Sequence, residues 1–315
     1  MVGVTAPQIR SAATLHADEV REVLALADRA AARDGVSPLS EATRLALRDP
    51  GVGTYLHLQA GDTAPIGYLF ASHHGDGADQ FVQAECVVDP DHRRRGIASA
   101  LVAALLASAP GADPTPMQVW AHGDLPGSAR LGDLHGFAPV RTLLKLALDL
   151  DGSTPSVRQP PAGFRVRTYR PGEDDVALLA LNARSFVHHP EQRAMDQRDL
   201  ARRMASDWFD ADGLFVAERE ATGELVAFHW TKAATPAPGA PTEGEIYVLG
   251  VHPDAQGQGF GTLMTQAGIA HLAGIGVSTI TLYVEGDNEA ALAMYGRQGF
   301  AEAARDVLYR TQPLP

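Results

Sequence analysis

The sequence is poor in cysteine. Among its 315 residues Cys86 is the only one, so no disulfide can form within the chain, and a reducing cytosol is the natural compartment. Cys86 lies in an apolar stretch, which favours a core thiol over a reactive one. The histidine pairs at 73–74 and 188–189 have no cysteine or carboxylate cluster at ligand spacing around them, so we expect solvated histidines and no metal.

Positive charge is also scarce. The chain has 26 Lys and Arg against 38 Asp and Glu, a formal charge of -12 and a pI near 5.4. Nucleic acids and anionic membranes are bound through clustered basic side chains, so we expect neither as a partner. No run reaches the roughly 18 apolar residues of a membrane span, and the N-terminus has no apolar segment behind a basic start. The composition predicts a soluble, cytoplasmic protein.

The glycine-rich stretch at 245–262 lacks the spacing of two familiar nucleotide loops, G-x-x-x-x-G-K-[ST] and G-x-G-x-x-G in register. It reads instead as an apolar strand, a turn at Pro253, a loop with three glycines, and a helix that starts near Phe260. Glycines let the backbone turn its N–H groups toward an anion, and the first N–H groups of a helix have no partners within the helix. The stretch predicts a pyrophosphate site that uses the backbone and needs no lysine.

The same pattern occurs earlier in the chain. R-x-x-G-x-A at 93–98 repeats Q-x-x-G-x-G at 256–261, and each residue follows its counterpart by 163 positions, as Gly259 follows Gly96. The register holds without a gap up to a closing Gly-Phe in each copy. A repeat of this length predicts two copies of one domain, and 315 residues provide for about two domains of roughly 150.

The order of predicted elements agrees with two α/β domains. The Pro-, Gly- and Ser-rich segment 151–163 is a linker between an N-terminal domain, 1–150, and a C-terminal domain, 164–315. Periodicity and capping residues predict helices at 17–33, 41–48, 96–108, 174–185, from 260 and through 288–297, and strands at 53–59, 65–72, 81–88, 117–121, 140–149, 164–169, 214–219 and 225–232. The stretch 188–210 has no clear period.

The loop resembles the acetyl-CoA loop of the GNAT N-acetyltransferases, [QR]-x-x-G-x-[GA], which also follows a strand and opens a helix. The resemblance implies two separate GNAT folds side by side, each a mixed, mostly antiparallel sheet flanked by helices, with acetyl-CoA as co-substrate. Acetyl transfer needs a base, because amines are mostly protonated at pH 7. Glu245 begins the strand that leads to the loop. In GNAT enzymes a tyrosine at the place of Tyr295 often donates to the CoA sulfur.

The two copies differ at these two positions. The offset of 163 places Val82 opposite Glu245 and Gly132 opposite Tyr295. The first copy keeps the cofactor loop and lacks both reactive groups. We therefore expect a catalytic C-terminal domain and an inactive N-terminal one. The plainer alternatives are that Glu245 is a solvated strand residue and Tyr295 a core aromatic.

Four segments narrow the resemblance to the mycothiol synthase family of tandem GNAT enzymes: His-Pro-Glu-Gln at 189–192, Phe-His-Trp-Thr-Lys at 228–232, and the stretches 244–251 and 282–288. The resemblance implies that acetyl-CoA acetylates the cysteinyl amine of 1D-myo-inositol 2-(L-cysteinylamino)-2-deoxy-α-D-glucopyranoside, a small thiol-sugar. The product is mycothiol, and the enzyme is expected to be a monomer.

The same resemblance implies the residues that bind each substrate. Contacts with the thiol-sugar are implied at Glu41, Glu191, Lys232, Glu245 and Tyr283. Contacts with acetyl-CoA are implied in the C-terminal domain at Leu249, Gly250, Val251, Gln256, Gly257, Gln258, Gly259, Phe260, Gly261, Thr262, Asn288, Glu289, Ala290, Ala291, Leu292 and Ala293, and in the N-terminal domain at Cys86, Val87, Val88, Arg94, Arg95, Gly96, Ile97, Ala98 and Ser99. The basic run 93–95 is expected to meet the CoA phosphates.

Two other functions stay open. A GNAT enzyme for a different amine, such as an aminoglycoside or a protein N-terminus, would share the loop but would not need the segments 188–192 and 228–232. A non-enzymatic acetyl-CoA sensor would need neither Glu245 nor Tyr295, and the presence of both in one copy argues against it.

Overall fold

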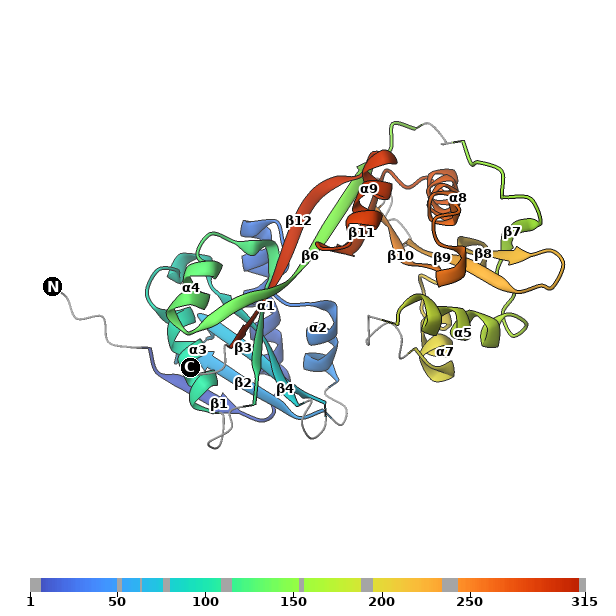
Figure 1. Cartoon of the computed structure of the whole chain (residues 1–315). Helices are drawn as coiled ribbons and strands as arrows, with labels where there is room; N and C mark the ends of the chain where they lie inside the picture. Colours follow the sequence, from blue (N-terminus) through green and yellow to red (C-terminus); the bar gives the residue numbers. More distant parts are fainter. Residues whose placement is uncertain are drawn as a thin grey trace. The chain divides into compact units, whose positions relative to one another are not determined.

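The computed structural model describes residues 7–49, 53–62, 64–75, 80–108, 115–152, 156–187, 195–233 and 243–311. The chain divides into two compact units (Figure 1). The N-terminal unit consists of Met1–Leu144, Glu285–Asp287 and Ala304–Pro315, and the C-terminal unit of Lys145–Val284 and Asn288–Ala303. Each unit therefore holds one copy of the repeat together with a strand end from the other half of the sequence.

The N-terminal unit is a sheet with helices on both faces. Its strands are β1 (Ile9–Ala12), β2 (Tyr55–Ala60), β3 (Gly67–His74), β4 (Phe81–Val88) and β5 (Met117–Ala121), followed in the strand order by the end of β12 (Ala301–Thr311) and the start of β6 (Phe137–Asp149). β4 and β5 are parallel, and the pairs from β1 to β4 and the pair of β5 with β12 are antiparallel. The unit's helices are α1 (Ala17–Asp34), α2 (Glu41–Arg48), α3 (Ile97–Ala107) and α4 (Ser128–Leu134).

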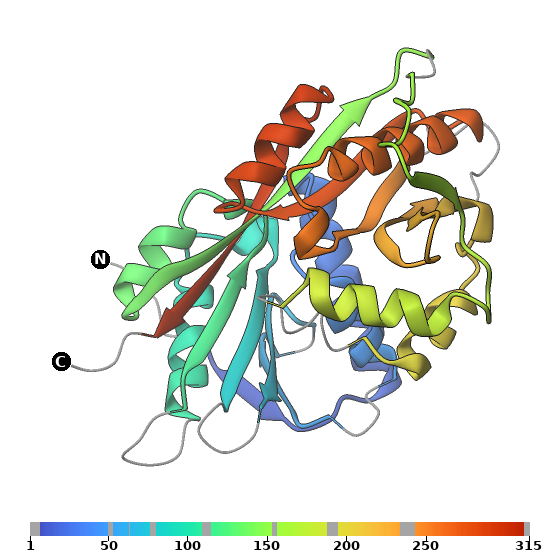
Figure 2. The same ribbon diagram turned by 45° about the vertical axis from the view of Figure 1, so that its right-hand side comes forward.

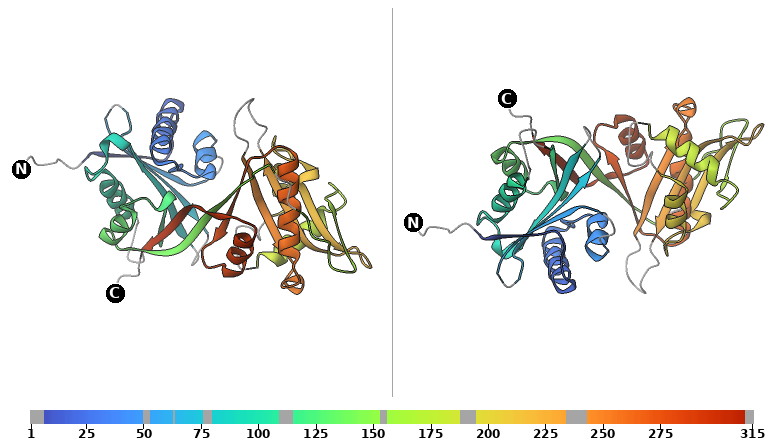
Figure 3. Two further views of the ribbon diagram at one scale, coloured as in Figure 1. Left: turned by 90° about the horizontal axis from the view of Figure 1, so that it is seen from above. Right: turned by 90° about the horizontal axis from the view of Figure 1, so that it is seen from below.

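Alternation along β3 explains why both faces of this sheet are covered. Tyr68 and Phe70 pack against the buried residues of α1 and α2, whereas Leu69 and Ala71 pack against those of α3. Successive side chains of a strand point to opposite faces, so a strand that is apolar at every position needs a helix layer on each side. Figure 3 shows α1 and α2 on one side of these strands and α3 on the other.

The C-terminal unit repeats this arrangement. Its strands are β7 (Phe164–Thr168), β8 (Leu214–Arg219), β9 (Leu225–Ala233), β10 (Glu243–Val251) and β11 (Thr279–Glu285), with the end of β6 beside β11. β10 and β11 are parallel, as β4 and β5 are. Helices α5 (Asp175–Ser185) and α7 (Gln197–Met204) share one core with Trp230, while α8 (Phe260–Gly274) packs with Ala227 on the other face (Figure 2). Helix α9 (Glu289–Arg297) follows β11.

Strands β6 and β12 each enter both units. They are neighbours in one continuous order, β1-β2-β3-β4-β5-β12-β6-β11-β10-β9-β8-β7. Val307–Arg310 of β12 pairs with β5 in the N-terminal unit, and Thr279 of β11 donates a hydrogen bond of 2.8 Å to Asp149 at the end of β6 in the C-terminal unit. The expectation of a mixed, mostly antiparallel sheet in each copy is confirmed. The expectation of two separate sheets is corrected, because each half of the sequence lends a strand end to the other.

The predicted elements agree closely with the structure where capping residues mark them. Helix α2 has the predicted bounds, and the Ser40 side chain accepts the hydrogen bond from the Thr43 N–H that caps it. Helix α7 was not predicted, because it lies in the stretch that showed no clear period. That helix has eight residues and buries only Leu200, so its apolar period is weak, although Asp196 and Asp199 form a capping box at its start.

Candidate cofactor sites and the candidate active site

The two glycine-rich loops adopt the same backbone conformation. Gly96 and Gly259 are the residues before α3 and α8, with φ of 80° and 88°. This left-handed region costs a residue with a side chain about 1–2 kcal/mol. A glycine at this point therefore allows the chain to turn directly into the helix, whose first N–H groups remain available to an anion.

The first residue of the motif ties the loop to the strand before it. Gln256 Nε2 donates to the Val251 carbonyl at 3.3 Å, and Arg93 Nε donates to the equivalent carbonyl, that of Val88, at 3.3 Å. The two side chains share this bond at an offset of 163. The [QR] position of the motif is thus explained by its hydrogen bond to the strand end, which both side chains can donate.

Arg93, the first residue of the basic run that is expected to meet the CoA phosphates, is also bound by a carboxylate of the protein itself. Its guanidinium forms a bidentate pair with Asp34 at the end of α1, at 2.7 and 2.6 Å, which raises the pKa of the arginine. Bidentate pairs hold both partners firmly. Arg93 therefore fastens the loop to α1 and is already committed to a carboxylate.

The third residue of each motif also braces the loop. Gln258 Nε2 donates to the Asp254 carbonyl at 2.9 Å, and Arg95 donates to the equivalent carbonyl, that of Asp91, at 3.1 Å. Between the braces, Arg94 adopts a φ of 62° where the second copy has a glycine. The N-terminal loop thus accepts backbone strain to place an exposed guanidinium at this point.

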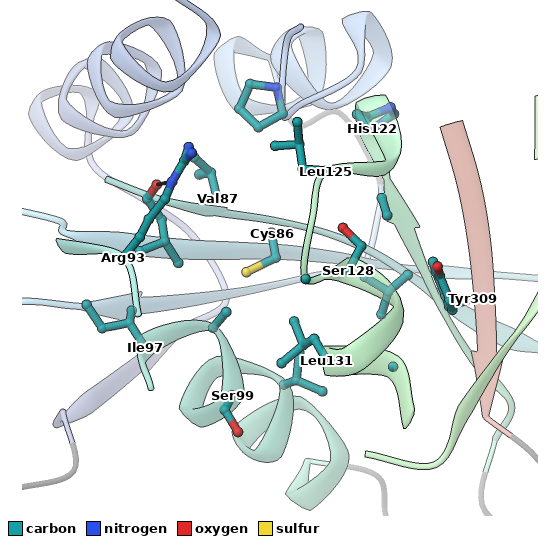
Figure 4. A pocket seen from close by; sticks show the side chains of 18 of the residues that line it. Cys86, Val87, Arg93, Ile97, Ser99, His122, Leu125, Ser128, Leu131 and Tyr309 are labelled. Atoms are coloured by element: carbon teal, nitrogen blue, oxygen red, sulfur yellow. Dashed lines mark hydrogen bonds between the residues drawn. The ribbon is translucent and has the colours of Figure 1, made fainter. Parts of the chain in front are cut away.

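A cavity of about 350 Å³ opens beside the N-terminal loop (Figure 4). It lies among the end of β4, the loop, α3, β5 and α4, and every implied cofactor residue of this copy except Arg95 lines it. The sulfur of Cys86 points into it (Figure 4). Burial raises the pKa of this thiol to about 12, so it stays protonated and is a poor nucleophile at neutral pH.

A buried charge cluster at this cavity was not predicted. The His122 imidazole lies between two carboxylates, with Nε2 3.3 Å from Glu85 and Nδ1 2.9 Å from Asp306. Burial alone would lower the pKa of His122, but the two carboxylates raise it to about 9. Burial would likewise raise the pKa of Glu85, yet His122 and the Ser40 N–H hold it below its usual value. Sequence separation hid this cluster, because Asp306 arrives on β12.

The place of Tyr295 is occupied differently in the N-terminal unit. A Cβ on Gly132, its equivalent, would lie 3.0 Å from the ring of Tyr309. Tyr309 comes from β12 and lines the cavity. The absence of a side chain at 132 therefore makes room for a tyrosine that belongs, in sequence, to the other copy.

Glu245 lies on β10 in the C-terminal unit, between two polar neighbours. It pairs with Lys232 on β9 and with Thr281 on β11. The register of β10 on β9 shifts between Ile246 and Val248, so the strand bulges at Tyr247, two residues after Glu245. Bulges re-aim side chains next to active sites. The β3–β4 pairing of the N-terminal unit has no such shift over Phe81–Val88.

Tyr295 lies on α9, whose start is capped by Asn288. The Asn288 side chain accepts a hydrogen bond of 3.1 Å from the Ala291 N–H. The Tyr295 ring is 7% exposed and meets Phe300 edge-on, with centroids 5.6 Å apart. Burial raises the pKa of its hydroxyl, so the group keeps its proton at neutral pH and can donate it.

Three of the five implied substrate residues come together on neighbouring strands of the C-terminal unit. Lys232 and Glu245 face each other across β9 and β10, and Tyr283 follows Thr281 by two residues on β11. The Lys232 ammonium also lies 5.2 Å from the ring of Trp208, a contact the sequence did not suggest. Glu41 is the first residue of α2 in the N-terminal unit, and Glu191 lies outside the described residues.

A basic residue near the C-terminal loop was also missed. A Cβ built on Gly259 would lie 3.0 Å from Nη1 of Arg158, in the predicted linker. The Arg158 backbone N–H donates to the Gln266 side chain on α8 at 3.1 Å, which holds this part of the linker against the helix. The loop itself contains no basic residue, but an arginine from a distant part of the sequence reaches it.

The described residues show neither a metal site nor a membrane-spanning helix. They contain no group of three His, Cys, Asp or Glu side chains that could hold a metal ion. Within the same part of the chain no helix is both long and apolar enough to cross a membrane.

Comparison with known proteins agrees with this geometry. The Acetyltransferase (GNAT) family matches residues 18–125 and 177–300. Proteins named mycothiol acetyltransferase are similar over nearly the full length: that of Geodermatophilus obscurus is 44% identical over 97% of this chain and 98% of its own, and that of Frankia alni 45% identical over 94% and 92%. The chain belongs to the mycothiol acetyltransferase family of GNAT proteins.

Solved structures support the fold of this family member. A GCN5-related N-acetyltransferase from Sphaerobacter thermophilus matches with a TM-score of 0.70 and 23% identity, over 98% of both chains. A tandem GNAT protein from the clavulanic acid biosynthesis pathway matches with a TM-score of 0.71 and 21% identity, over 98% of this chain and 99% of its own. At these identities the likeness concerns the fold, including its tandem arrangement.

Proposed function

We propose that this member of the mycothiol acetyltransferase family transfers the acetyl group of acetyl-CoA to the cysteinyl amine of 1D-myo-inositol 2-(L-cysteinylamino)-2-deoxy-α-D-glucopyranoside. The proposed substrate rests on one observation: the chain is more than 40% identical over nearly its whole length to proteins named mycothiol acetyltransferase. The position of Glu245 beside Lys232 and near Tyr283 supports it, because a polyhydroxylated amine needs charged and hydrogen-bonding partners.

Chemistry takes place in the C-terminal unit in this proposal. The Glu245 carboxylate accepts a proton from the substrate ammonium, directly or through water, and the free amine attacks the thioester carbonyl. The new N–C bond forms as the C–S bond breaks, and Tyr295 donates its proton to the leaving thiolate. The second proton that the nitrogen loses passes through water to restore the Tyr295 hydroxyl, and Glu245 releases its proton to solvent. Both substrates are bound at once, and no acyl-enzyme forms. Cys86 has no part, since it lies in the other unit as a protonated thiol.

The proposed contacts with acetyl-CoA follow the two loops. In the C-terminal unit the pyrophosphate meets the N–H groups from Gln256 to Thr262 at the start of α8, and Arg158 supplies the positive charge that the loop lacks. In the N-terminal unit the cavity beside Gly96 takes a second acetyl-CoA. This copy is catalytically silent, because Val82 cannot accept a proton and Gly132 cannot donate one. We further propose a cytoplasmic monomer in which 151–163 links the two copies of the repeat along the sequence.

Turnover with a small panel of amines tests the function. The purified protein is given acetyl-CoA and either the cysteinyl glucosaminyl-inositol, an aminoglycoside or a peptide with a free N-terminus, and release of the CoA thiol is followed. We expect kcat/KM for the first amine to exceed the others by at least about 100-fold, since its contacts extend over several charged groups. A better rate with another amine would indicate a different GNAT enzyme. Binding of acetyl-CoA without turnover of any amine would indicate a sensor.

A further inference from the structure

The chain uses lysine sparingly, and both of its lysines lie in the same sheet. Of 26 basic side chains only Lys145 and Lys232 are lysines. Lys232 lies on β9, opposite Glu245. Lys145 lies on β6, in the part of that strand that enters the C-terminal unit. The first half of the sequence therefore supplies a cation to the unit that contains Glu245.

Lys145 fixes a second carboxylate beside Glu245. Its ammonium lies 3.1 Å from Oε1 of Glu243, and the Thr281 hydroxyl donates to the same oxygen at 3.0 Å. Glu243 and Glu245 are two residues apart on β10, so their side chains share a face. Thr281 is also the residue of β11 that pairs with Glu245. Lys145 and Thr281 together hold the Glu243 carboxylate, which lies on the strand face that it shares with the candidate base.

Charge couples Lys145 to this face of the sheet. Burial alone would lower the pKa of Lys145, but Glu243 raises it above its usual value, with further contributions from Tyr283 and Glu245. Lys145 is therefore an ammonium at neutral pH. The attraction is mutual, so the same ammonium favours the carboxylate form of Glu245. Among the described residues, the titratable side chains around Glu245 in the sheet are Lys145 on β6, Lys232 on β9, Glu243 and Tyr247 on β10, and Tyr283 on β11. Arg203 of α7 contacts the hydroxyl of Tyr247 from the helix layer.

We propose that Lys145 is a positioning residue for acetyl transfer: it neutralises Glu243 and keeps Glu245 in the carboxylate form that accepts the proton of the substrate amine. The inference rests on the proposed role of Glu245. A compact ammonium suits this place, because one point charge must serve two neighbouring carboxylates. The equivalent residue of the other copy is Leu308, 163 positions later, which is buried and apolar. The copy without the base therefore also lacks the cation.

The pH profile of kcat/KM for Lys145→Met tests this role. Loss of a cation near a base favours its protonated form, so we expect the acidic limb to move to higher pH by roughly 0.5 to 1 unit. Below the limb kcat/KM should fall about three- to tenfold, with a smaller change on the plateau. Lys145→Arg keeps the charge and should keep the wild-type limb. Arg219→Met, which breaks the exposed pair with Glu224 at the same cost in net charge, should leave the limb in place.

A double substitution separates electrostatics from packing. In Lys145→Met with Glu243→Gln, both charges of the pair are gone, so the limb should return toward its wild-type position. If the acidic limb of Lys145→Met stays at the wild-type pH while Glu245→Gln is inactive, the proposed role of Lys145 is overturned and the proposed base still stands. Equal losses in the Met and Arg variants at every pH also overturn it, because they indicate packing. Full activity of Glu245→Gln overturns the proposed base, whatever the Lys145 variants do.

Discussion

The two copies of the repeat hold their cofactor loops with the same bonds and surround them with different chemistry. In each, the first motif residue donates to the strand end and the third to the preceding turn, although one copy uses arginine and the other glutamine. Beyond the loop the copies diverge. The C-terminal unit has Glu245 and Tyr295, and the N-terminal unit has a buried Glu-His-Asp cluster and a tyrosine from another strand. The same loop geometry is therefore found beside different chemical groups in the two copies.

The largest effect we predict is a loss of stability when the charge cluster that distinguishes the N-terminal unit is broken. His122→Gln leaves Glu85 and Asp306 without their cation, and breaking a buried pair costs about 3 kcal/mol or more. The wild type should show a matching pH dependence. Because the folded pKa of His122 is raised to about 9, its contribution is complete below the ordinary pKa of 6.5 and is lost as the pH rises through 9.

Thermal unfolding from pH 6 to pH 10 checks this prediction. The wild-type midpoint should fall across the upper half of that range, and the His122→Gln midpoint should be lower at pH 6 and fall less. The contribution of Glu85 to stability has the opposite pH dependence. Its pKa is lowered in the folded protein, so this contribution is lost on acidification. Equal slopes for the two proteins above pH 7 would contradict the assigned charge of His122.

The second prediction breaks the feature that the copies share. Gly259→Val forces a β-branched residue into a φ of 88° and blocks the approach to the helix start, so binding of acetyl-CoA to the C-terminal unit should weaken by about 100-fold or more. Calorimetry with Gly96→Val in the background isolates this site. The single Gly96→Val variant is the matched control and should retain turnover. Unchanged binding in the double variant would refute the loop assignment.

A smaller effect concerns the positive charge near the C-terminal loop. Arg158→Ala removes the guanidinium beside Gly259 and should weaken binding of acetyl-CoA to the C-terminal unit by about three- to fivefold, the scale of an exposed ion pair. The loss should shrink at high salt. Arg170→Ala, which breaks the exposed pair with Glu173, is the control of equal charge. If both variants bind equally well, the backbone alone binds the pyrophosphate.

The smallest effect is expected for a substitution in the N-terminal copy, which is proposed to be inactive. Val82→Ala, at the place equivalent to Glu245, should lower stability through its buried position and leave turnover nearly unchanged. Gly132→Ala is a poorer control, because its Cβ would press on the ring of Tyr309. Steady-state kinetics at saturating acetyl-CoA makes the measurement. A large loss of kcat in a folded Val82→Ala protein would indicate that the reaction takes place in the N-terminal copy, which contradicts the proposal.

Much of the fold could be predicted because the signals were local. The loop glycines, the Ser40 cap and the apolar strands lie within a few residues of the structure they specify, and the repeat doubled the signal of the loops. The exchange of β6 and β12 could not be predicted in this way. Nothing near residue 145 or 306 indicates which sheet the strand end will join, since that depends on pairing across more than a hundred residues.

The candidate site shows the same division. Glu245 and Tyr295 became candidates because of their places beside the loop and in the GNAT resemblance, and because the other copy provided a reference at a fixed offset. Lys145, Arg158 and Asp306 had no such reference, because each reaches its partners from a distant part of the chain. The pairing of Arg93 with Asp34 was not predicted for the same reason, since that carboxylate belongs to α1.

The central claim is that the C-terminal copy performs the reaction with Glu245 as its base. The most direct test is kcat for Glu245→Gln with saturating acetyl-CoA and the cysteinyl amine, beside Gly96→Val as the lesion of the other copy. The account predicts a loss of about 10² to 10³-fold for Glu245→Gln, the range for a general base, with binding of acetyl-CoA retained. Wild-type kcat in Glu245→Gln together with a lost kcat in Gly96→Val would contradict it.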